Sequence, residues 1–158
     1  KGISLQSAIW KRPAPDTIPT DAKAAGLYMI CTLSKHEAEK NGYTDALMLD
    51  YKGRVAESTG ANIFFVIGGE IHTPVPDCFL NGITRQTVIE IVKTKGFNLI
   101  EKHIMPTEIS SYDEAFLTGT AAEITPIKSI DNISYNVGNN TTGYELMNDF
   151  TQLVNSTL

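Results

Sequence analysis

Short apolar segments bounded by turn residues dominate this sequence, and only three stretches place apolar residues at helical spacing. The short segments have the length or the alternation that is typical of β-strands. They cover residues 3–11, 44–50, 54–58, 62–67, 70–74, 98–104, 114–120, 124–131 and 132–136. The helical stretches cover residues 24–40, 84–95 and 144–155. Because strands and helices are mixed without a regular βαβ repeat, the sequence predicts an α+β (mixed α/β) domain rather than a doubly wound one.

Glycine and proline mark the ends of these segments. The proline-rich stretch 12–20 indicates an extended loop, Gly68-Gly69 indicates the turn of a hairpin, and Gly96 indicates the end of the second helix. Residues 106–113 are expected to form a short helix or turn. The last helix is expected to dock on the core through residues at helical spacing, namely Leu146, Met147, Phe150, Leu153 and Val154.

Composition and charge limit the possible classes of function. The chain has 158 residues, of which 42% are hydrophobic and 20% charged, and this balance suits one folded domain rather than a disordered chain. A formal net charge of −5 gives no basic field for nucleic acid, and no run is long and apolar enough for a membrane span. Cys31 and Cys78 form no CxxC pair and the histidines lack ligand spacing, so the sequence predicts no metal site and a cytoplasmic protein.

Two charged residues stand in unusual surroundings. Lys23, in the stretch PTDAKAAGLY, lies among small residues where a loop turns into a helix. Glu57, in RVAESTG, lies at the end of an apolar strand. Each could be an ordinary surface charge, and Glu57 could instead be a carboxylate that stays ionised to pair with a buried cation. Neither stretch decides between these interpretations.

Two further stretches suit the binding of an anion. In NGITR, residues 81–85, we expect Thr84 to be the N-cap of a helix whose first N–H groups lack internal partners and attract phosphate. In TGTAAEIT, residues 118–125, Gly119 and its small neighbours would let a ligand approach the backbone, while the hydroxyl of Thr120 can donate to it. An ordinary cap and a tight corner after a strand are the alternatives.

The four stretches together resemble one family of enzymes. DAKAAGLY, LMLDYKGRVAESTGANIFFV, NGITR and GTAAEITPI occur in an order that resembles fold-type IV pyridoxal-phosphate enzymes, specifically branched-chain amino-acid aminotransferases. GTAAEITP is the most specific part, because sister enzymes that use D-amino acids or aminodeoxychorismate usually differ there. The resemblance implies that residues 1–158 form one domain, equivalent to the family's large C-terminal domain with its barrel-like mixed sheet and flanking helices, and that the small N-terminal domain is absent.

The resemblance also implies a pyridoxal 5'-phosphate cofactor and a role for each matching residue. Lys23 would form the internal aldimine and carry a proton between the substrate Cα and the cofactor, a role that suits a buried, neutral amine. Glu57 would pair with the pyridine nitrogen and Tyr28 would bind the phenolic oxygen. The phosphate would be bound at Gly82, Ile83, Thr84, Gly119 and Thr120, and the substrate carboxylate at Thr120 and Ala121. The two glycines would be required because a side chain would block the ligand.

The implied activity is transfer of an amino group between leucine, isoleucine or valine and 2-oxoglutarate. Gly60-Ala-Asn62 stands where the family commonly has GEN, and Leu27 and Asn81 also depart from its pattern, which leaves the substrate preference open. The family's N-terminal domain normally supplies an arginine for the phosphate, and Arg85 is expected to order the helix start rather than replace it. We therefore expect residues 1–158 alone to be weakly active or inactive, and the parent protein to form a homo-oligomer.

Two alternatives remain at this point. The first keeps the cofactor but changes the reaction, to that of a D-amino-acid aminotransferase, an (R)-amine aminotransferase or an aminodeoxychorismate lyase. The second is a catalytically silent domain that is retained for folding or for contact between subunits. The joint presence of Lys23, Tyr28, Glu57 and Thr120 speaks against a silent parent protein.

Overall fold

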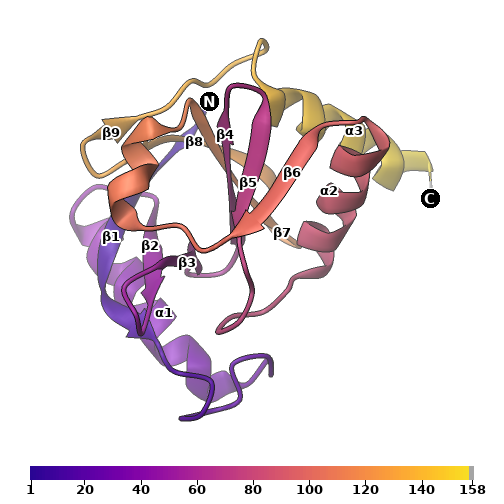
Figure 1. The fold of residues 1–158 in the computed structure, drawn as a ribbon. Helices are drawn as coiled ribbons and strands as arrows, with labels where there is room; N and C mark the ends of the chain where they lie inside the picture. Colours follow the sequence, from indigo (N-terminus) through magenta and orange to yellow (C-terminus); the bar gives the residue numbers. More distant parts are fainter. Residues whose placement is uncertain (157–158) are drawn as a thin grey trace.

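The computed structural model describes residues 1–156, so the last two positions of the expected 1–158 domain lie outside the described residues. Strands and helices alternate irregularly along the chain, as expected for a mixed α/β domain (Figure 1). The strands are β1 (Ile3–Arg12), β2 (Asp45–Asp50), β3 (Val55–Ser58), β4 (Asn62–Ile67), β5 (Glu70–Pro74), β6 (Asn98–Lys102), β7 (Glu114–Gly119), β8 (Glu123–Ile130) and β9 (Ile133–Ser134). The helices are α1 (Ala25–Lys40), α2 (Ile83–Thr94) and α3 (Thr142–Ser156), with a short 3₁₀ helix, η1 (Pro106–Ser111).

Six of the strands form a closed ring. The sheet order runs β3-β2-β1-β8-β7-β4, and β4 pairs with β3 again, which closes a small barrel. β1 is parallel to both β2 and β8, whereas the other pairs of the ring are antiparallel. The mixed, barrel-like sheet predicted from the sequence is therefore confirmed. Closure also removes free strand edges within the ring, so the barrel exposes few unpaired backbone groups.

The closure between β3 and β4 is made at one end of the barrel. Glu57 of β3 lies opposite Asn62 of β4, and Asn62 lies opposite Thr118 of β7 on its other side. Farther along β4, residues Phe65 to Ile67 pair with β5 instead, and β6 then joins β5 in parallel. The sheet thus splits beside Asn62, and the polar ends of three strands meet there.

Two apolar clusters stabilise the barrel from inside and outside. The inner cluster, within the ring, includes Leu5, Leu47, Ile63, Phe65 and Ile127, all fully buried. The outer cluster joins β4, β5 and β7 to helices α2 and α3, with the fully buried residues Phe64, Ile71, Val88, Phe116 and Leu146 at its centre. Alternate residues of β4 supply both clusters, as expected from the period of two in a strand.

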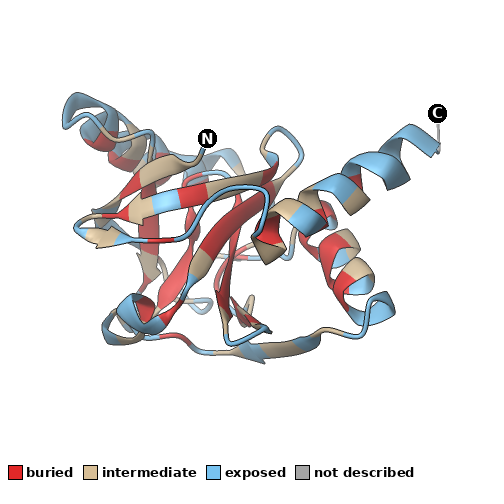
Figure 2. Cartoon of the chain, turned by 90° about the horizontal axis from the view of Figure 1, so that it is seen from above, coloured by how far each residue is buried: buried red, intermediate tan, exposed pale blue. Residues whose placement is uncertain are grey.

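The helices cover different sides of the barrel. Helix α1 packs on β1 and β2, while α2 and α3 lie together on the opposite side, near β6, β7 and β8 (Figure 1). The predicted docking of the last helix is correct for Leu146 and Phe150, which are buried. It is wrong for Leu153 and Val154, which are 45% and 39% exposed, because the end of α3 extends beyond the body (Figure 2).

Candidate functional site

A cavity of about 300 Å³ opens at the end of the barrel where β3 meets β4. Residues from the loop before α1, the ends of β1 and β3, the loop before α2 and the end of β7 line it. One wall is buried and polar, since Arg12, Glu57, Asn62, Thr84 and Thr118 each have less than a tenth of their surface exposed. The volume lies at the lower end of the range for small-molecule and cofactor sites, roughly 300–1,000 Å³.

The chain brings eight of the nine residues expected from the sequence to this one cavity. These are Lys23, Tyr28, Glu57, Gly82, Ile83, Thr84, Gly119 and Thr120. The ninth, Ala121, lines a neighbouring cavity of about 480 Å³ instead. The two cavities share Tyr28, Cys31 and residues 59–61 of the turn before β4, so they lie on either side of the same segment.

Glu57 lies against a buried arginine that the sequence analysis did not select. The Nε atom of Arg12, a residue that is only 4% exposed, lies 3.3 Å from Oε1 of Glu57. The guanidinium also contacts α1, because Nη1 donates to the Leu27 carbonyl oxygen at 3.4 Å and to Cys31 Sγ at 3.6 Å. Arg12 thereby connects the end of β1, the acid of β3 and the first turns of α1. A buried cation is the partner that an ionised acid at this position requires.

Burial and the charge of Arg12 act on Glu57 in opposite directions. Burial disfavours the carboxylate and raises its pKa, while the positive charge of Arg12 lowers it and offsets part of this effect. The net result is a pKa of Glu57 raised from 4.5 to about 7. The Nε atom of Arg12 is itself buried without a hydrogen-bond partner among residues 1–156. The pair therefore holds a carboxylate that can change protonation state near neutral pH and has room for another polar group.

Lys23 and Tyr28 lie on the open side of the cavity. Lys23 lies directly before Ala24, the N-cap of α1, and Tyr28 lies in the first turn of that helix. Both side chains are exposed. Among the described residues, no hydrogen bond or ion pair holds the Lys23 amine. The buried amine expected from the sequence is thus not formed by residues 1–156 alone, although the amine is free to meet a ligand.

The start of α2 differs from its expected form in one respect. Its N-cap is Gly82, not Thr84, which lies in the first turn of the helix. No side chain caps this first turn. An uncapped first turn presents N–H groups without side-chain acceptors, and the helix dipole adds partial positive charge there. The N–H groups of Ile83 and Thr84 at the cavity therefore form a suitable place for an anion.

The two glycines expected to bind the ligand, Gly82 and Gly119, are explained by their neighbours in the structure. A Cβ atom on Gly82 would lie 2.6 Å from Oδ1 of Asn62, and one on Gly119 would lie 3.2 Å from Cβ of Ala61. Gly82 also donates its N–H to Asn62 at 3.1 Å, so this amide is already engaged. The expected reason for both glycines was room for a ligand, whereas the contact that excludes a side chain at Gly82 is with Asn62.

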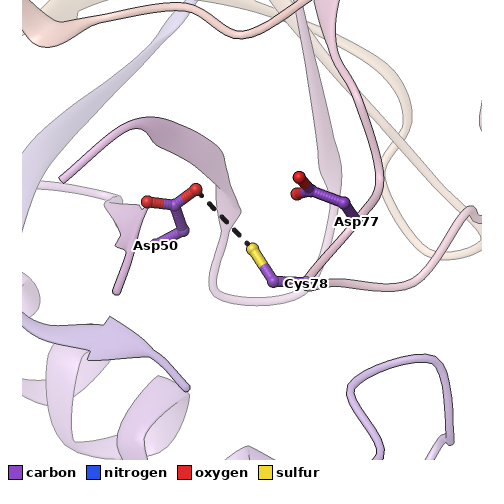
Figure 3. A group of neighbouring side chains, drawn as sticks. All are labelled: Asp50, Asp77 and Cys78. Atoms are coloured by element: carbon purple, nitrogen blue, oxygen red, sulfur yellow. Dashed lines mark hydrogen bonds between the residues drawn. The ribbon is translucent and has the colours of Figure 1, made fainter. Parts of the chain in front are cut away.

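A second polar cluster lies outside the cavity, between β2 and the loop after β5. One carboxylate oxygen of Asp50, one of Asp77 and the Sγ atom of Cys78 lie within 4.8 Å of one another, the arrangement of a candidate metal site. The Cys78 thiol donates a hydrogen bond to Asp50 (Figure 3). The guanidinium of Arg54 already donates to both carboxylates. Burial raises the pKa of Cys78 to about 12, which keeps the thiol protonated. Arg54 supplies the positive charge here, and the cluster fastens the β2–β3 hairpin to the loop before α2.

Sequence reasoning missed the supporting residues of the cavity. Arg12 was given no role, and Asn62 was noted only as part of a motif that departs from GEN. Arg12 and Glu57 are 45 positions apart, and no spacing rule connects them. The one available signal was an arginine at the junction between a strand-like segment and the proline-rich stretch 12–20.

A comparison with known families identifies the family of this chain. The family model described as amino-transferase class IV matches residues 4–130, and the chain belongs to this family. Among curated relatives, a probable branched-chain-amino-acid aminotransferase of Rickettsia felis is 47% identical over 131 residues, or 83% of this chain and 45% of that protein. The chain thus spans about half the length of the curated relatives it matches.

Solved structures of similar proteins share the fold. The branched-chain aminotransferase of Thermoproteus uzoniensis with norvaline has a TM-score of 0.93 and 38% identity, covering 98% of this chain and 52% of that one. The branched-chain amino acid aminotransferase of Thermobaculum terrenum in its PLP form has a TM-score of 0.93 and 36% identity, covering 99% of this chain and 52% of that one. The resemblance noted from the sequence motifs is therefore confirmed.

Proposed function

We propose that the protein containing this chain is a pyridoxal-phosphate-dependent branched-chain amino-acid aminotransferase. It would transfer an amino group between leucine, isoleucine or valine and 2-oxoglutarate. The observation that carries the proposal is the gathering of Lys23, Tyr28, Glu57, Thr84 and Thr120 around one cavity, although these residues are spread over nearly a hundred positions. The names of the relatives, and the PLP form of one of them, support the same activity.

The residues of the cavity fit the cofactor. A primary amine, a phenol, a buried acid beside a cation and an uncapped helix start surround a space of about 300 Å³. When bound, pyridoxal phosphate supplies a cationic ring that accepts the electrons released when the substrate loses its Cα proton. The uncapped start of α2 suits the phosphate, and the acid suits the ring nitrogen. The chain therefore offers a partner to each end of the cofactor.

Glu57 and Arg12 would act as a unit on the ring nitrogen. Glu57 must be ionised to accept a hydrogen bond from a protonated nitrogen, and burial alone disfavours that charge. The charge of Arg12 at 3.3 Å favours the ionised form. Tyr28, on α1, would donate its hydroxyl proton to the phenolic oxygen. Arg12 would thus be a positioning residue, since it acts through Glu57.

Lys23 would bind the cofactor through Nζ and move a proton at the substrate Cα. Its exposed position at the mouth of the cavity supports this, because the amine can reach both the cofactor and an incoming substrate. The hydroxyl of Thr120 would donate to the phosphate, and the backbone of Thr120 and Ala121 would meet the substrate carboxylate. Ala121 lines the neighbouring cavity, which a substrate extending past the shared turn would enter.

We propose further that residues 1–158 correspond to the C-terminal cofactor-binding domain of the relatives. The rest of the enzyme would then cover the open side of the cavity, where Lys23, Tyr28 and Ile83 are exposed. On this view residues 1–158 alone bind the cofactor weakly and turn over slowly or not at all. The whole enzyme would be a cytoplasmic homo-oligomer with small-molecule substrates and no nucleic-acid or membrane partner. Among residues 1–156, no helix is long and apolar enough to cross a membrane.

Spectroscopy on the full protein tests the proposal. Adding pyridoxal phosphate is expected to produce the visible absorption of lysine-bound cofactor, and Lys23→Ala should abolish it. Lys40→Ala is the matched control, because Lys40 is an exposed lysine at the far end of α1 and does not line the cavity. A protein that stays colourless with added cofactor would contradict the proposal and favour the silent domain.

A panel of amino donors separates the remaining alternatives. The proposed enzyme should prefer L-leucine, L-isoleucine and L-valine with 2-oxoglutarate as acceptor. Preference for D-amino acids or (R)-amines, or release of pyruvate from aminodeoxychorismate, would instead indicate one of the sister reactions.

A further inference from the structure

The side chain of Asn62 connects the barrel to the loop before α2. Asn62 begins β4 and is 5% exposed. Its Nδ2 donates to the carbonyl oxygen of Leu80 at 2.9 Å, and its Oδ1 accepts the N–H of Gly82 at 3.1 Å. Both ends of one amide are therefore used on two residues of the same loop. Such a pair of bonds fixes the loop in position and in orientation, as a single bond does not.

The backbone of Asn62 is itself fixed to the site. It pairs with Glu57 of β3 on one side and with Thr118 of β7 on the other. The same residue thus contacts the strand that carries the acid, the strand that leads to Thr120, and the loop that leads into α2. Asn62 therefore links the strand of Glu57 to the loop that leads into α2.

Gly82 is shaped to receive this side chain. Its φ of −60° and ψ of 148° lie in a region open to any residue, so backbone conformation does not require glycine here. Space does, because a Cβ atom would lie 2.6 Å from Oδ1 of Asn62. The glycine and the asparagine therefore form a matched pair, and a change in either affects the other.

We propose that Asn62 is a positioning residue that holds the first turn of α2 at the spacing from Glu57 that a phosphate-bearing ligand needs. The inference rests on the proposed function and adds a residue that acts through the loop rather than on the ligand. A rigid cofactor is bound well only if its two end sites are spaced to match it. Without the amide of Asn62, the helix start remains but its N–H groups are no longer fixed relative to the acid.

Other contacts hold the same loop but do not set this spacing. Arg54 donates to Asp77 near the beginning of the loop, and Arg85 donates to the Pro74 carbonyl oxygen and to Asn81. These contacts join the loop to the β2–β3 turn and to α2, and they join α2 to the end of β5. Asn62 makes the link between Leu80–Gly82 and the strand beside Glu57, so its loss should affect the phosphate end of the ligand in particular.

The test compares two ligands that differ only in the phosphate. Binding of pyridoxal phosphate and of pyridoxal is measured on the full protein with Asn62→Ala. The expected result is a loss of about 10-fold in affinity for pyridoxal phosphate, the factor that corresponds to two modest hydrogen bonds. Affinity for pyridoxal should change by less than about 2-fold, because Lys23 and Glu57 remain. Equal losses for both ligands would overturn the inference and indicate a general effect on folding.

Thr73→Val provides the matched control. Thr73 is fully buried and donates to the carbonyl oxygen of Ile63, next to Asn62 in β4, at 2.8 Å, but it does not line the cavity. Thr73→Val should lower the free energy of unfolding without changing the ratio of the affinities for pyridoxal phosphate and pyridoxal. A wild-type protein that binds pyridoxal phosphate no better than pyridoxal would overturn the proposed function, and this inference with it.

A double-mutant cycle provides the second measurement. Gly82→Ala should weaken pyridoxal phosphate binding in the wild-type background, because its methyl group displaces the Asn62 amide. In the Asn62→Ala background the same substitution should have little effect, since the atom it would strike is gone. Equal effects of Gly82→Ala in the two backgrounds would contradict the matched pair and overturn the inference.

Discussion

Inside the barrel, Leu5, Leu47 and Ile127 pack with no exposed surface, whereas at the end of the same barrel Arg12 and Glu57 are nearly as buried but polar. The interior needs no further partner, because apolar side chains are stabilised by burial and close packing alone. The polar wall is incomplete in this respect, since Arg12 Nε and Thr118 Oγ1 are buried without hydrogen-bond partners among residues 1–156. Buried polar groups without partners cost stability and are expected where a ligand completes the site. The barrel interior therefore stabilises the fold, whereas the polar wall leaves buried polar atoms that suit the binding of a ligand.

The largest expected effect comes from emptying the barrel interior. Phe65 is fully buried and stacks on Tyr112 with ring centroids 4.8 Å apart. Phe65→Ala should lower the free energy of unfolding by about 3–5 kcal/mol, the cost of a large cavity. Its effect on cofactor affinity should stay below about 3-fold, because Phe65 does not line the functional cavity. Urea denaturation and cofactor titration together check this prediction. A large loss of cofactor affinity with little loss of stability would contradict the separate roles of the barrel interior and the polar wall.

The next largest expected effect is an increase in the free energy of unfolding when Glu57, in the polar wall, is replaced by glutamine. The folded-state pKa of Glu57 is raised from 4.5 to about 7, so the folded protein binds this proton more tightly than the unfolded chain does. The corresponding stability is present below pH 4.5 and is lost as the pH rises through about 7. The glutamine of Glu57→Gln stays neutral, so the variant should not lose this stability at high pH. Without cofactor, the variant should be more stable than the wild type by up to about 3 kcal/mol at pH 8.

The pH dependence of unfolding checks this prediction. The difference between Glu57→Gln and the wild type should be near zero at pH 4 and should grow through the window between pH 4.5 and about 7. Arg12→Met should extend the window to higher pH, because the charge that lowers the pKa of Glu57 is gone. A Glu57→Gln protein that is less stable than the wild type at pH 8 would show instead that the ion pair with Arg12 is a net source of stability.

The smallest effect is expected far from both regions. Val154, on the last turns of α3, is 39% exposed and lies where the helix extends beyond the body (Figure 2). Val154→Gln should change the free energy of unfolding by less than about 0.5 kcal/mol and leave cofactor affinity unchanged. Thermal unfolding checks it in the full protein. A loss above about 1 kcal/mol would mean that this exposed turn is covered by another part of the protein.

The sequence predicted the elements of the fold well because each carries local signals. Gly68 and Gly69 have positive φ angles in the hairpin between β4 and β5, and Gly96 has one at the end of α2. Closure of the barrel had no such signal, since it depends on the pairing of Glu57 with Asn62 across a turn. The exposure of Leu153 could not be predicted either, because helical spacing does not say where the partner surface ends.

The candidate site was predictable where residues act through their own chemistry. Lys23, Glu57 and Thr120 belong to short stretches with a recognisable pattern, and all three line the cavity. Residues that act on other residues were not predictable. Arg12 reaches Glu57 only because β1 and β3 flank β2 in the sheet, and Asn62 reaches Gly82 only because the loop folds back. The N-cap of α2 was assigned to Thr84 by its side-chain oxygen, whereas Gly82 takes that position beside Asn62.

Mapping the cofactor attachment site tests the central claim most directly. The full protein is incubated with pyridoxal phosphate, reduced with borohydride, digested, and analysed by mass spectrometry for the phosphopyridoxyl group. The cavity described here predicts that the label lies on Lys23 at about one group per chain, and that Glu57→Gln and Asn62→Ala lower its yield. Label spread over exposed lysines such as Lys40, or absent from Lys23, would contradict the assignment of this cavity as the cofactor site.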